Sequence, residues 1–251
     1  MSVTDGDPGD ERGPRQRIAD NVARVRDGIA AACRRAGRSP ASVTLVAVTK
    51  YVSADLTQLV LEAGVTDLAE SRPQALWGKA EALATVLPPP RWHLVGHLQR
   101  NKLQRTLPLL AMLQTLDSLR LLHGIQAEAD RLPVDERVRR DVLVEVNLTD
   151  DPGRSGVALA DVPALVRAAA EAPAVQLRGL MGMAGHPDAE AADARRDFAR
   201  LRTLRDELAA TLPDPTMLAE LSMGMSGDFE AGILEGATLV RIGSALFEGL
   251  T

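Results

Sequence analysis

The stretch Val43-Thr-Leu-Val-Ala-Val-Thr-Lys50 places a lysine at the end of an apolar run that has the pattern of a buried β-strand. The run is apolar on both faces, as is typical of a parallel strand covered by helices. Only three of the 29 basic residues are lysines (Lys50, Lys79 and Lys102), so lysine is not the usual surface cation here. A desolvated lysine can lose its proton and attack a carbonyl carbon, which arginine cannot do. Lys50 is therefore the first candidate for a reactive residue, and a lysine that reaches solvent from a strand end is the plainer interpretation.

Short β-type runs alternate with amphipathic helical stretches along the rest of the chain. Strands are expected over residues 43–49, 66–70, 91–96, 112–117, 142–148, 176–183, 219–225 and 238–243. Helices are expected over residues 54–63, 74–86, 119–131, 162–172 and 191–210, with one more over residues 15–36 before the first strand. Eight parallel strands connected in this way predict an α/β protein with a single (β/α)8 TIM barrel and an extra N-terminal helix. Residues 1–14 are polar and are interpreted as a disordered tail, which leaves residues 15–251 as one domain.

The alternative architecture is an open, doubly wound sheet, which binds dinucleotides at a glycine-rich turn after its first strand. Here that turn, residues 49–55, is Thr-Lys-Tyr-Val-Ser-Ala-Asp and contains no glycine. The missing glycine signature favours the barrel.

Composition excludes several classes of function. The net charge is −5 with acids and bases interspersed, which argues against a protein that binds nucleic acid through broad phosphate attraction. No apolar run approaches the ~20 residues of a membrane span, and the first residues lack a signal-peptide pattern. The single cysteine, Cys33, excludes an internal disulfide. We expect a cytoplasmic monomer that binds neither nucleic acid nor membranes.

Polar residues mark the carboxyl ends of the last two expected strands, where barrels commonly bind phosphate. At the seventh strand the chain reads Leu221-Ser-Met-Gly-Met-Ser-Gly-Asp228, and at the end of the eighth a Gly243-Ser244 turn follows two residues after Arg241. Taken singly, these are an ordinary helix cap and a tight turn. The last strand of a closed barrel lies beside the first, so together they favour a phosphate-binding site next to the Lys50 amine.

These stretches carry a family resemblance that covers nearly the whole chain after the tail. The sequence resembles the pyridoxal phosphate homeostasis proteins, single-domain relatives of alanine racemase. The matching stretches are Leu45-Val-Ala-Val-Thr-Lys50, Trp92-His-Leu-Val-Gly-His-Leu-Gln-Arg-Asn-Lys102, Leu116-Asp-Ser118, Gly179-Leu-Met181, Leu221-Ser-Met-Gly-Met-Ser-Gly-Asp228 and Val240-Arg-Ile-Gly-Ser-Ala-Leu-Phe247.

The resemblance implies that Lys50 holds pyridoxal 5′-phosphate as a Schiff base and that Arg241 faces the pyridine nitrogen. It also implies that the phosphate is surrounded by Ser222, Ser226, Gly243 and Ser244. A guanidinium only donates hydrogen bonds, so the pyridine nitrogen must accept and stay unprotonated, which makes the ring a poorer electron sink. The implied function is a reservoir that buffers the cofactor and passes it to pyridoxal-phosphate-dependent apo-enzymes by transient contact, without robust catalysis of its own.

One short stretch departs from the family pattern. Where the family has Gly-Glu-Asn after the second strand, this chain has Ala69-Glu70-Ser71. Ser71 remains a cofactor-binding candidate, but it lacks the amide donor and some of the reach of asparagine.

Two enzymes are the alternatives: a pyridoxal-phosphate-dependent amino-acid racemase, and a Schiff-base aldolase that uses Lys50 without a cofactor. The racemases need a second base opposite the lysine, usually a tyrosine. The only tyrosine here is Tyr51, whose side chain should point away from Lys50 if the strand continues. His93 lies in the middle of an expected strand and is interpreted as a hydrogen-bonded interior histidine.

Overall fold

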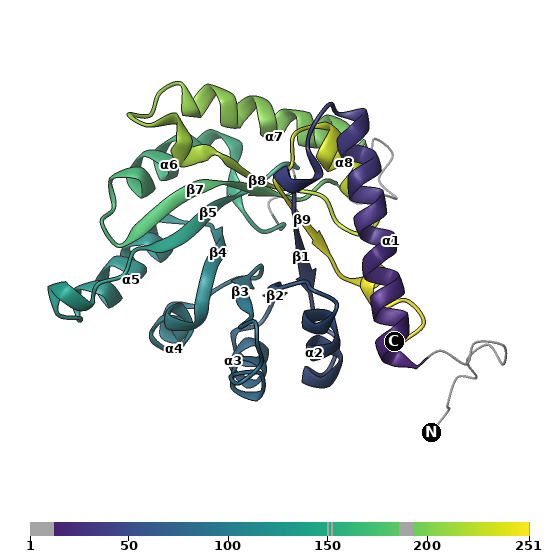
Figure 1. Cartoon of the computed structure of the whole chain (residues 1–251). Coiled ribbons are helices and arrows are strands. Elements are labelled where there is room, and N and C mark those ends of the chain that lie inside the picture. The colour runs from purple at the N-terminus through teal and green to yellow at the C-terminus, as the bar shows by residue number, and fades with distance from the viewer. Residues whose placement is uncertain (1–12, 150, 152, 186–192, 251) are drawn as a thin grey trace.

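The computed structural model describes residues 13–149, 151, 153–185 and 193–250. Within these residues eight parallel strands close into a ring (Figure 1). In ring order they are β1 (Thr44–Val48), β2 (Asp67–Glu70), β3 (Arg91–Leu94), β4 (Leu110–Leu116), β5 (Arg140–Asn147), β7 (Val175–Gly182), β8 (Glu220–Ser222) and β9 (Leu239–Ile242). The pairings β4–β5 and β9–β1 complete the ring, and the short strand β6 (Val157–Ala158) pairs with the end of β5. The predicted barrel is confirmed.

Helices surround the ring and bury their apolar faces against it. They are α2 (Ala54–Glu62), α3 (Pro73–Ala82), α4 (Leu103–Thr106), α5 (Leu119–Asp130), α6 (Val162–Glu171), α7 (Ala194–Ala209) and α8 (Phe229–Leu234). Two of them begin at serine caps: the Ser53 hydroxyl accepts from the Leu56 N–H at 3.3 Å, and the Ser118 hydroxyl accepts from the Leu121 N–H at 3.2 Å. Such a cap contributes about 1 kcal/mol. None of the helices in the described ranges has the length and hydropathy needed to cross a bilayer.

The N-terminal helix α1 (Pro14–Arg35) takes the place of an eighth outer helix. It packs against α2 and α8, whereas β9 is followed only by a 3-10 turn, Ser244–Leu246 (Figure 1). The Asn21 amide donates to the carbonyl oxygens of Leu246 and Glu248, both at 3.1 Å. These bonds tie α1 to the segment after the last strand, so the expected helix is structural.

The predicted tail falls mostly outside the described residues. Residues 1–12 are not described, and Pro14, which we assigned to the tail, is the first residue of α1. Proline suits that position because its missing N–H would have no helical partner there. The first helix thus begins one residue earlier than expected, and the disorder of the tail stays a prediction.

The barrel interior holds a buried apolar cluster that consists of Val46, Ala69, Met112, Leu143, Met181 and Leu239. It also holds polar side chains, with His93, Gln114, Ser222 and Arg241 all buried. His93 was predicted to be a hydrogen-bonded interior histidine, which its contacts with Asp67 and Gln114 confirm.

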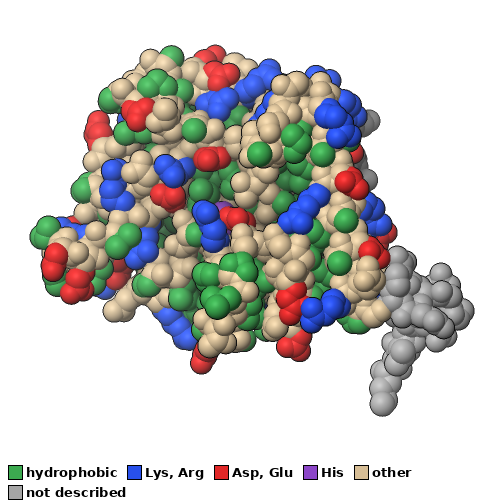
Figure 2. Space-filling model, in the orientation of Figure 1, with side chains coloured by type: hydrophobic (Ala, Val, Ile, Leu, Met, Phe, Trp, Pro, Cys, Tyr) green, Lys and Arg blue, Asp and Glu red, His purple; other side chains and the backbone are tan. Residues whose placement is uncertain are grey.

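The surface carries interspersed charge. On the face drawn in Figure 2, acidic and basic side chains alternate rather than forming one area of single sign. Several acids pair with arginines, as Arg178 does with Asp141 at 3.1 Å and Arg131 with Glu128 at 2.8 Å. Exposed pairs contribute about 0–1 kcal/mol each, so they matter little to the stability of the barrel.

Candidate functional site

A cavity of about 480 Å3 lies at the carboxyl ends of the strands. The residues that line it come from the ends of β1, β2, β3, β7, β8 and β9, which is where barrels place their reactive groups. The structure brings six of the seven expected site residues to its wall: Lys50, Ser71, Ser226, Arg241, Gly243 and Ser244. Residues that are remote in sequence therefore share one cavity.

Ser222 is the expected site residue that does not line the cavity. Its side chain is fully buried one layer below. Its hydroxyl donates to the Gln114 amide oxygen at 2.6 Å and accepts from Nη1 of Arg241 at 2.7 Å. Ser222 therefore supports Arg241 instead of reaching the cavity.

Lys50 lies two residues beyond the end of β1, in a turn in which the Val52 N–H donates to the Thr49 carbonyl oxygen at 3.1 Å. The lysine side chain is exposed, as a lysine that reaches solvent from a strand end would be. Its ammonium lies 4.7 Å from the centre of the Tyr51 ring, and both residues line the cavity. Tyr51 was expected to point away from Lys50. That expectation was wrong, because side chains alternate only while the strand continues.

Hydrogen-bond donors gather where the chain leaves β8 and β9. Among the described residues, the backbone N–H groups of Ser226, Gly227 and Ser244 have no acceptor, and all three residues line the cavity. The Ser226 hydroxyl accepts from the N–H groups of Gly243 and Ala245, both at 3.3 Å. Clustered backbone N–H groups and hydroxyls form an anion-binding site. We call the donors of Ser226, Gly227 and Ser244 the anion cup.

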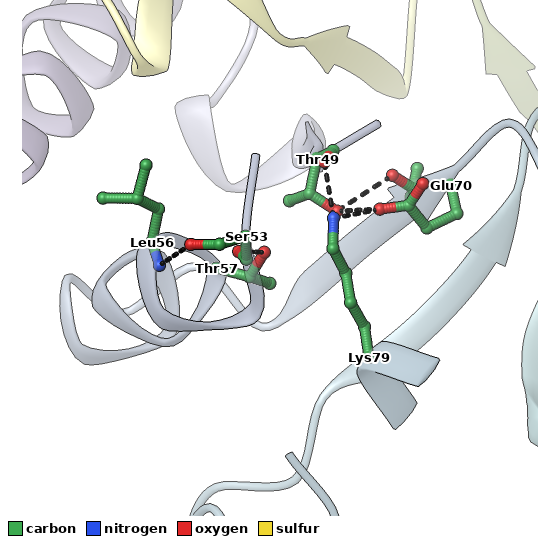
Figure 3. Close-up of polar contacts among 7 residues, drawn as sticks. Thr49, Ser53, Leu56, Thr57, Glu70 and Lys79 are labelled. Atoms are coloured by element: carbon green, nitrogen blue, oxygen red, sulfur yellow. Dashed lines mark hydrogen bonds and ion pairs between the residues drawn. The ribbon is translucent and has the colours of Figure 1, made fainter. Parts of the chain in front are cut away.

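A buried ion pair joins the two strand ends beside the cup, and sequence reasoning missed it. Nζ of Lys79, on α3, donates to Oε1 of Glu70 at 2.5 Å and to the Thr49 carbonyl oxygen at 2.6 Å (Figure 3). The Thr49 hydroxyl donates to the same carboxylate oxygen at 2.6 Å. Glu70 is fully buried and Lys79 is 9% exposed. The pair fixes the backbone directly before Lys50 and Ser71. The scarcity of lysine in this chain is the sequence signal that could have drawn attention to Lys79.

A glycine lets the loop after β3 approach Ser71. A Cβ atom at Gly96 would lie 2.1 Å from the Ser71 carbonyl oxygen, which no side chain can tolerate. The backbones of the β2 and β3 ends are therefore in direct contact at the cavity wall.

Arg241 is a buried, charged donor at the same wall. Burial lowers its pKa to about 10, and the negative charges of Glu145 and Asp228 oppose that shift. The guanidinium therefore stays protonated at neutral pH. Nη1 donates to both oxygens of Ser222 at 2.7 Å, and Nη2 donates to the Gly182 carbonyl oxygen at 3.0 Å.

Glu145 on β5 is a second buried acid, close enough to Arg241 to influence its pKa. Burial raises the pKa of Glu145, the Ser155 hydroxyl bond at 2.6 Å lowers it, and the Asp117 charge raises it further. The pKa is thus higher in the folded than in the unfolded protein. As the pH rises through the unfolded value of about 4.3, ionisation begins to favour unfolding.

We therefore expect Glu145→Gln to raise the melting temperature at neutral pH, because it removes a buried charge and keeps an oxygen that can accept from Ser155. The difference from the original protein should shrink as the pH falls below about 4, where the unfolded chain is also protonated. Thermal melts at several pH values measure this, with the exposed Glu171→Gln as control. A lower melting temperature at neutral pH would contradict the assigned pKa direction.

The comparisons with known proteins agree with this architecture. Residues 16–250 match the model of the family described as alanine racemase, N-terminal domain. Alanine racemase from Bartonella henselae superposes with a TM-score of 0.68 at 12% identity, over 93% of this chain and 58% of that one. That likeness shows the fold alone.

More similar relatives share most of their length with this chain. The pyridoxal phosphate homeostasis protein of Pseudomonas aeruginosa is 40% identical over 92% of this chain and 94% of its own. That of Escherichia coli K12 is 36% identical over 92% and 95%. PipY of Synechococcus elongatus, whose structure was solved with PLP bound, is 32% identical with a TM-score of 0.78, over 92% and 99%. The chain belongs to the alanine racemase N-terminal domain family and, within it, to the pyridoxal phosphate homeostasis proteins.

Proposed function

We propose that this protein binds pyridoxal 5′-phosphate in the cavity, holds it as a Schiff base on Lys50, and buffers or delivers it. Delivery would occur in the cytoplasm, by transient contact of a monomer with pyridoxal-phosphate-dependent apo-enzymes. The observation that carries the proposal is that a primary amine and the anion cup share one cavity. The names of the relatives, and the PLP-bound structure of PipY, support the same ligand.

The donor set fits the cofactor at three points. Pyridoxal phosphate supplies an aldehyde that condenses with a primary amine, with loss of one water. Lys50 is the amine at the cavity wall, and Ser226, Gly227 and Ser244 offer unpaired N–H groups that suit the phosphate dianion. Arg241 offers a fixed donor to the ring nitrogen.

The position of Tyr51 favours a carrier over a racemase. Tyr51 is the only tyrosine of the chain, and its ring lies against the Lys50 ammonium instead of facing it across the cavity. A phenol on the same side as the lysine cannot serve as the second base on the opposite face of a planar cofactor. The donor at the ring nitrogen also weakens the electron sink on which carbanion chemistry depends.

Borohydride trapping tests the proposal. The protein is mixed with pyridoxal phosphate, freed of unbound cofactor by gel filtration, and examined by absorbance before and after reduction. We expect a visible-region band that borohydride removes, and a reduced adduct on the peptide containing Lys50. A protein that stays colourless would contradict cofactor binding and would favour the aldolase alternative.

Solvent exchange of the α-proton separates the carrier from the racemase. L- and D-alanine are incubated with the loaded protein in D2O and followed by NMR. A carrier exchanges the proton no faster than the same concentration of free pyridoxal phosphate. Exchange of the α-proton well above that rate would contradict the carrier function and favour the racemase.

A further inference from the structure

A continuous chain of hydrogen-bonded polar side chains crosses the barrel interior and ends on Arg241, and all of its members except Asp67 are buried. It starts at Asp67 on β2, whose Oδ1 lies 3.0 Å from Nε2 of His93 on β3. Nδ1 of His93 lies 2.9 Å from the Gln114 amide nitrogen on β4, and the Gln114 amide oxygen accepts from the Ser222 hydroxyl on β8 at 2.6 Å. Strands β4 and β8 are not neighbours in the ring, so the last bond spans the interior. The Ser222 hydroxyl in turn accepts from Arg241 at 2.7 Å.

The direction of every bond in this chain follows from the chemistry of Arg241. A guanidinium only donates, so the Ser222 oxygen accepts from it and the Ser222 proton goes to the Gln114 carbonyl oxygen. Gln114 must then present its NH2 group to His93, whose Nδ1 accepts and whose Nε2 carries the proton toward Asp67. One tautomer of His93 and one orientation of the amide are therefore selected.

The far end of the chain is an anion. Burial acts to raise the pKa of Asp67, but interactions that include the hydrogen bond from His93 and the charge of Arg91 outweigh burial and lower the pKa. A carboxylate at that position can only accept, which agrees with the proton on Nε2 of His93. A buried cation and a half-buried anion thus lie at the two ends of the network, and the three side chains between them are all hydrogen-bonded. Hydrogen-bonded networks of this kind rigidify a core.

The same bonds leave part of Arg241 available to a ligand. Three of its five N–H groups donate to the Ser222 carbonyl, the Ser222 hydroxyl and the Gly182 carbonyl, so two donors remain without an acceptor among the described residues. Arg241 lines the cavity, so an acceptor that enters the cavity can take up a free donor of this side chain.

We propose that Asp67, His93, Gln114 and Ser222 form a positioning relay that holds Arg241 as a fixed donor, so that the cavity selects an aromatic ring with an unprotonated nitrogen. The ligand class rests on the proposed function, whereas the relay exists in the unliganded protein. None of the four relay residues touches the cofactor in this assignment; they act through Arg241.

The first test needs no ligand. Nitrogen-15 NMR of the His93 imidazole reports which ring nitrogen carries the proton. We expect a neutral ring protonated at Nε2, and in Gln114→Glu a ring protonated at both nitrogens, because the new carboxylate can only accept from Nδ1. A neutral ring protonated at Nδ1 in the original protein would overturn the relay.

The second test compares pyridoxal phosphate with its 1-deaza analogue, in which a C–H replaces the ring nitrogen. We expect the original protein to bind the analogue at least ~10-fold more weakly, since a buried charged donor loses its acceptor. Ser222→Ala should reduce this preference to less than about threefold. Thr115→Val, which removes a buried hydroxyl on the same strand as Gln114 that bonds only to the Gly96 carbonyl, should keep it.

The outcomes separate the two proposals. Full preference retained in Ser222→Ala would overturn the relay while leaving cofactor binding intact. Failure of the original protein to bind either compound would overturn the proposed function, and the His93 measurement would then decide the relay alone.

Discussion

Lys50→Ala should lose the visible absorbance of bound pyridoxal phosphate and bind the cofactor at least ~100-fold more weakly. The reason is that Lys50 is the lysine that lines the cavity, and a Schiff base needs a primary amine there. The phosphate contacts of the anion cup remain in the variant, so weak non-covalent binding should persist. Absorbance and fluorescence titrations measure both quantities.

Two matched variants separate the role of the Lys50 amine in Schiff-base formation from the role of its positive charge. Lys50→Arg keeps a cation beside Tyr51 but cannot condense with an aldehyde at neutral pH, so it should also stay colourless. Lys102→Ala removes a lysine outside the cavity lining and should behave like the original protein. A trapped adduct on Lys79 or Lys102, or a visible band in Lys50→Ala, would refute the assignment of Lys50.

Lys79→Met should lower the free energy of unfolding by about 3–5 kcal/mol, because it leaves the Glu70 carboxylate buried without its cation. Oε1 of Glu70 accepts from Lys79 and Thr49, and Oε2 has no partner among the described residues (Figure 3). The variant therefore leaves a buried charge with a single neutral donor. Urea denaturation without cofactor measures the loss.

The double variant Glu70→Gln with Lys79→Met is the control. It removes both charges and keeps an oxygen that can accept from Thr49, so it should recover part of the lost stability. A loss below about 1 kcal/mol in the single variant would mean that the pair is solvated in solution. Because Lys79 also bonds the Thr49 carbonyl, the single variant should loosen the turn that carries Lys50.

Local sequence patterns predicted much of the barrel. Apolar runs such as residues 142–146 form strands because both of their faces are covered, and the observed strands begin or end within a few residues of the expected ones. The position of α1 could not be predicted in this way: within the described residues β9 is followed by a 3-10 turn, and α1 covers that side of the ring. The packing of α1 against this side of the ring depends on contacts between the two ends of the chain, and local sequence patterns do not reveal such contacts.

The residues of the candidate site were likewise predicted only in part from the sequence. Lys50, Ser226, Arg241, Gly243 and Ser244 could be named from the sequence because each lies near or just after the carboxyl end of a strand, and parallel strands bring these ends together. Whether a side chain near a strand end reaches the cavity depends on where the strand stops. That is why Tyr51 turned toward Lys50 and Ser222 stayed below the cavity.

The sequence by itself determined the order of strands and helices, the lysine after the first strand, and the polar turns after the last two. Only the tertiary structure decided which polar groups meet: Lys79 with Glu70, and Asp67 with Arg241 through three intervening side chains. The physical reason is that strand formation depends on neighbours along the chain, whereas a buried donor finds its acceptor only after ring closure brings distant strands together.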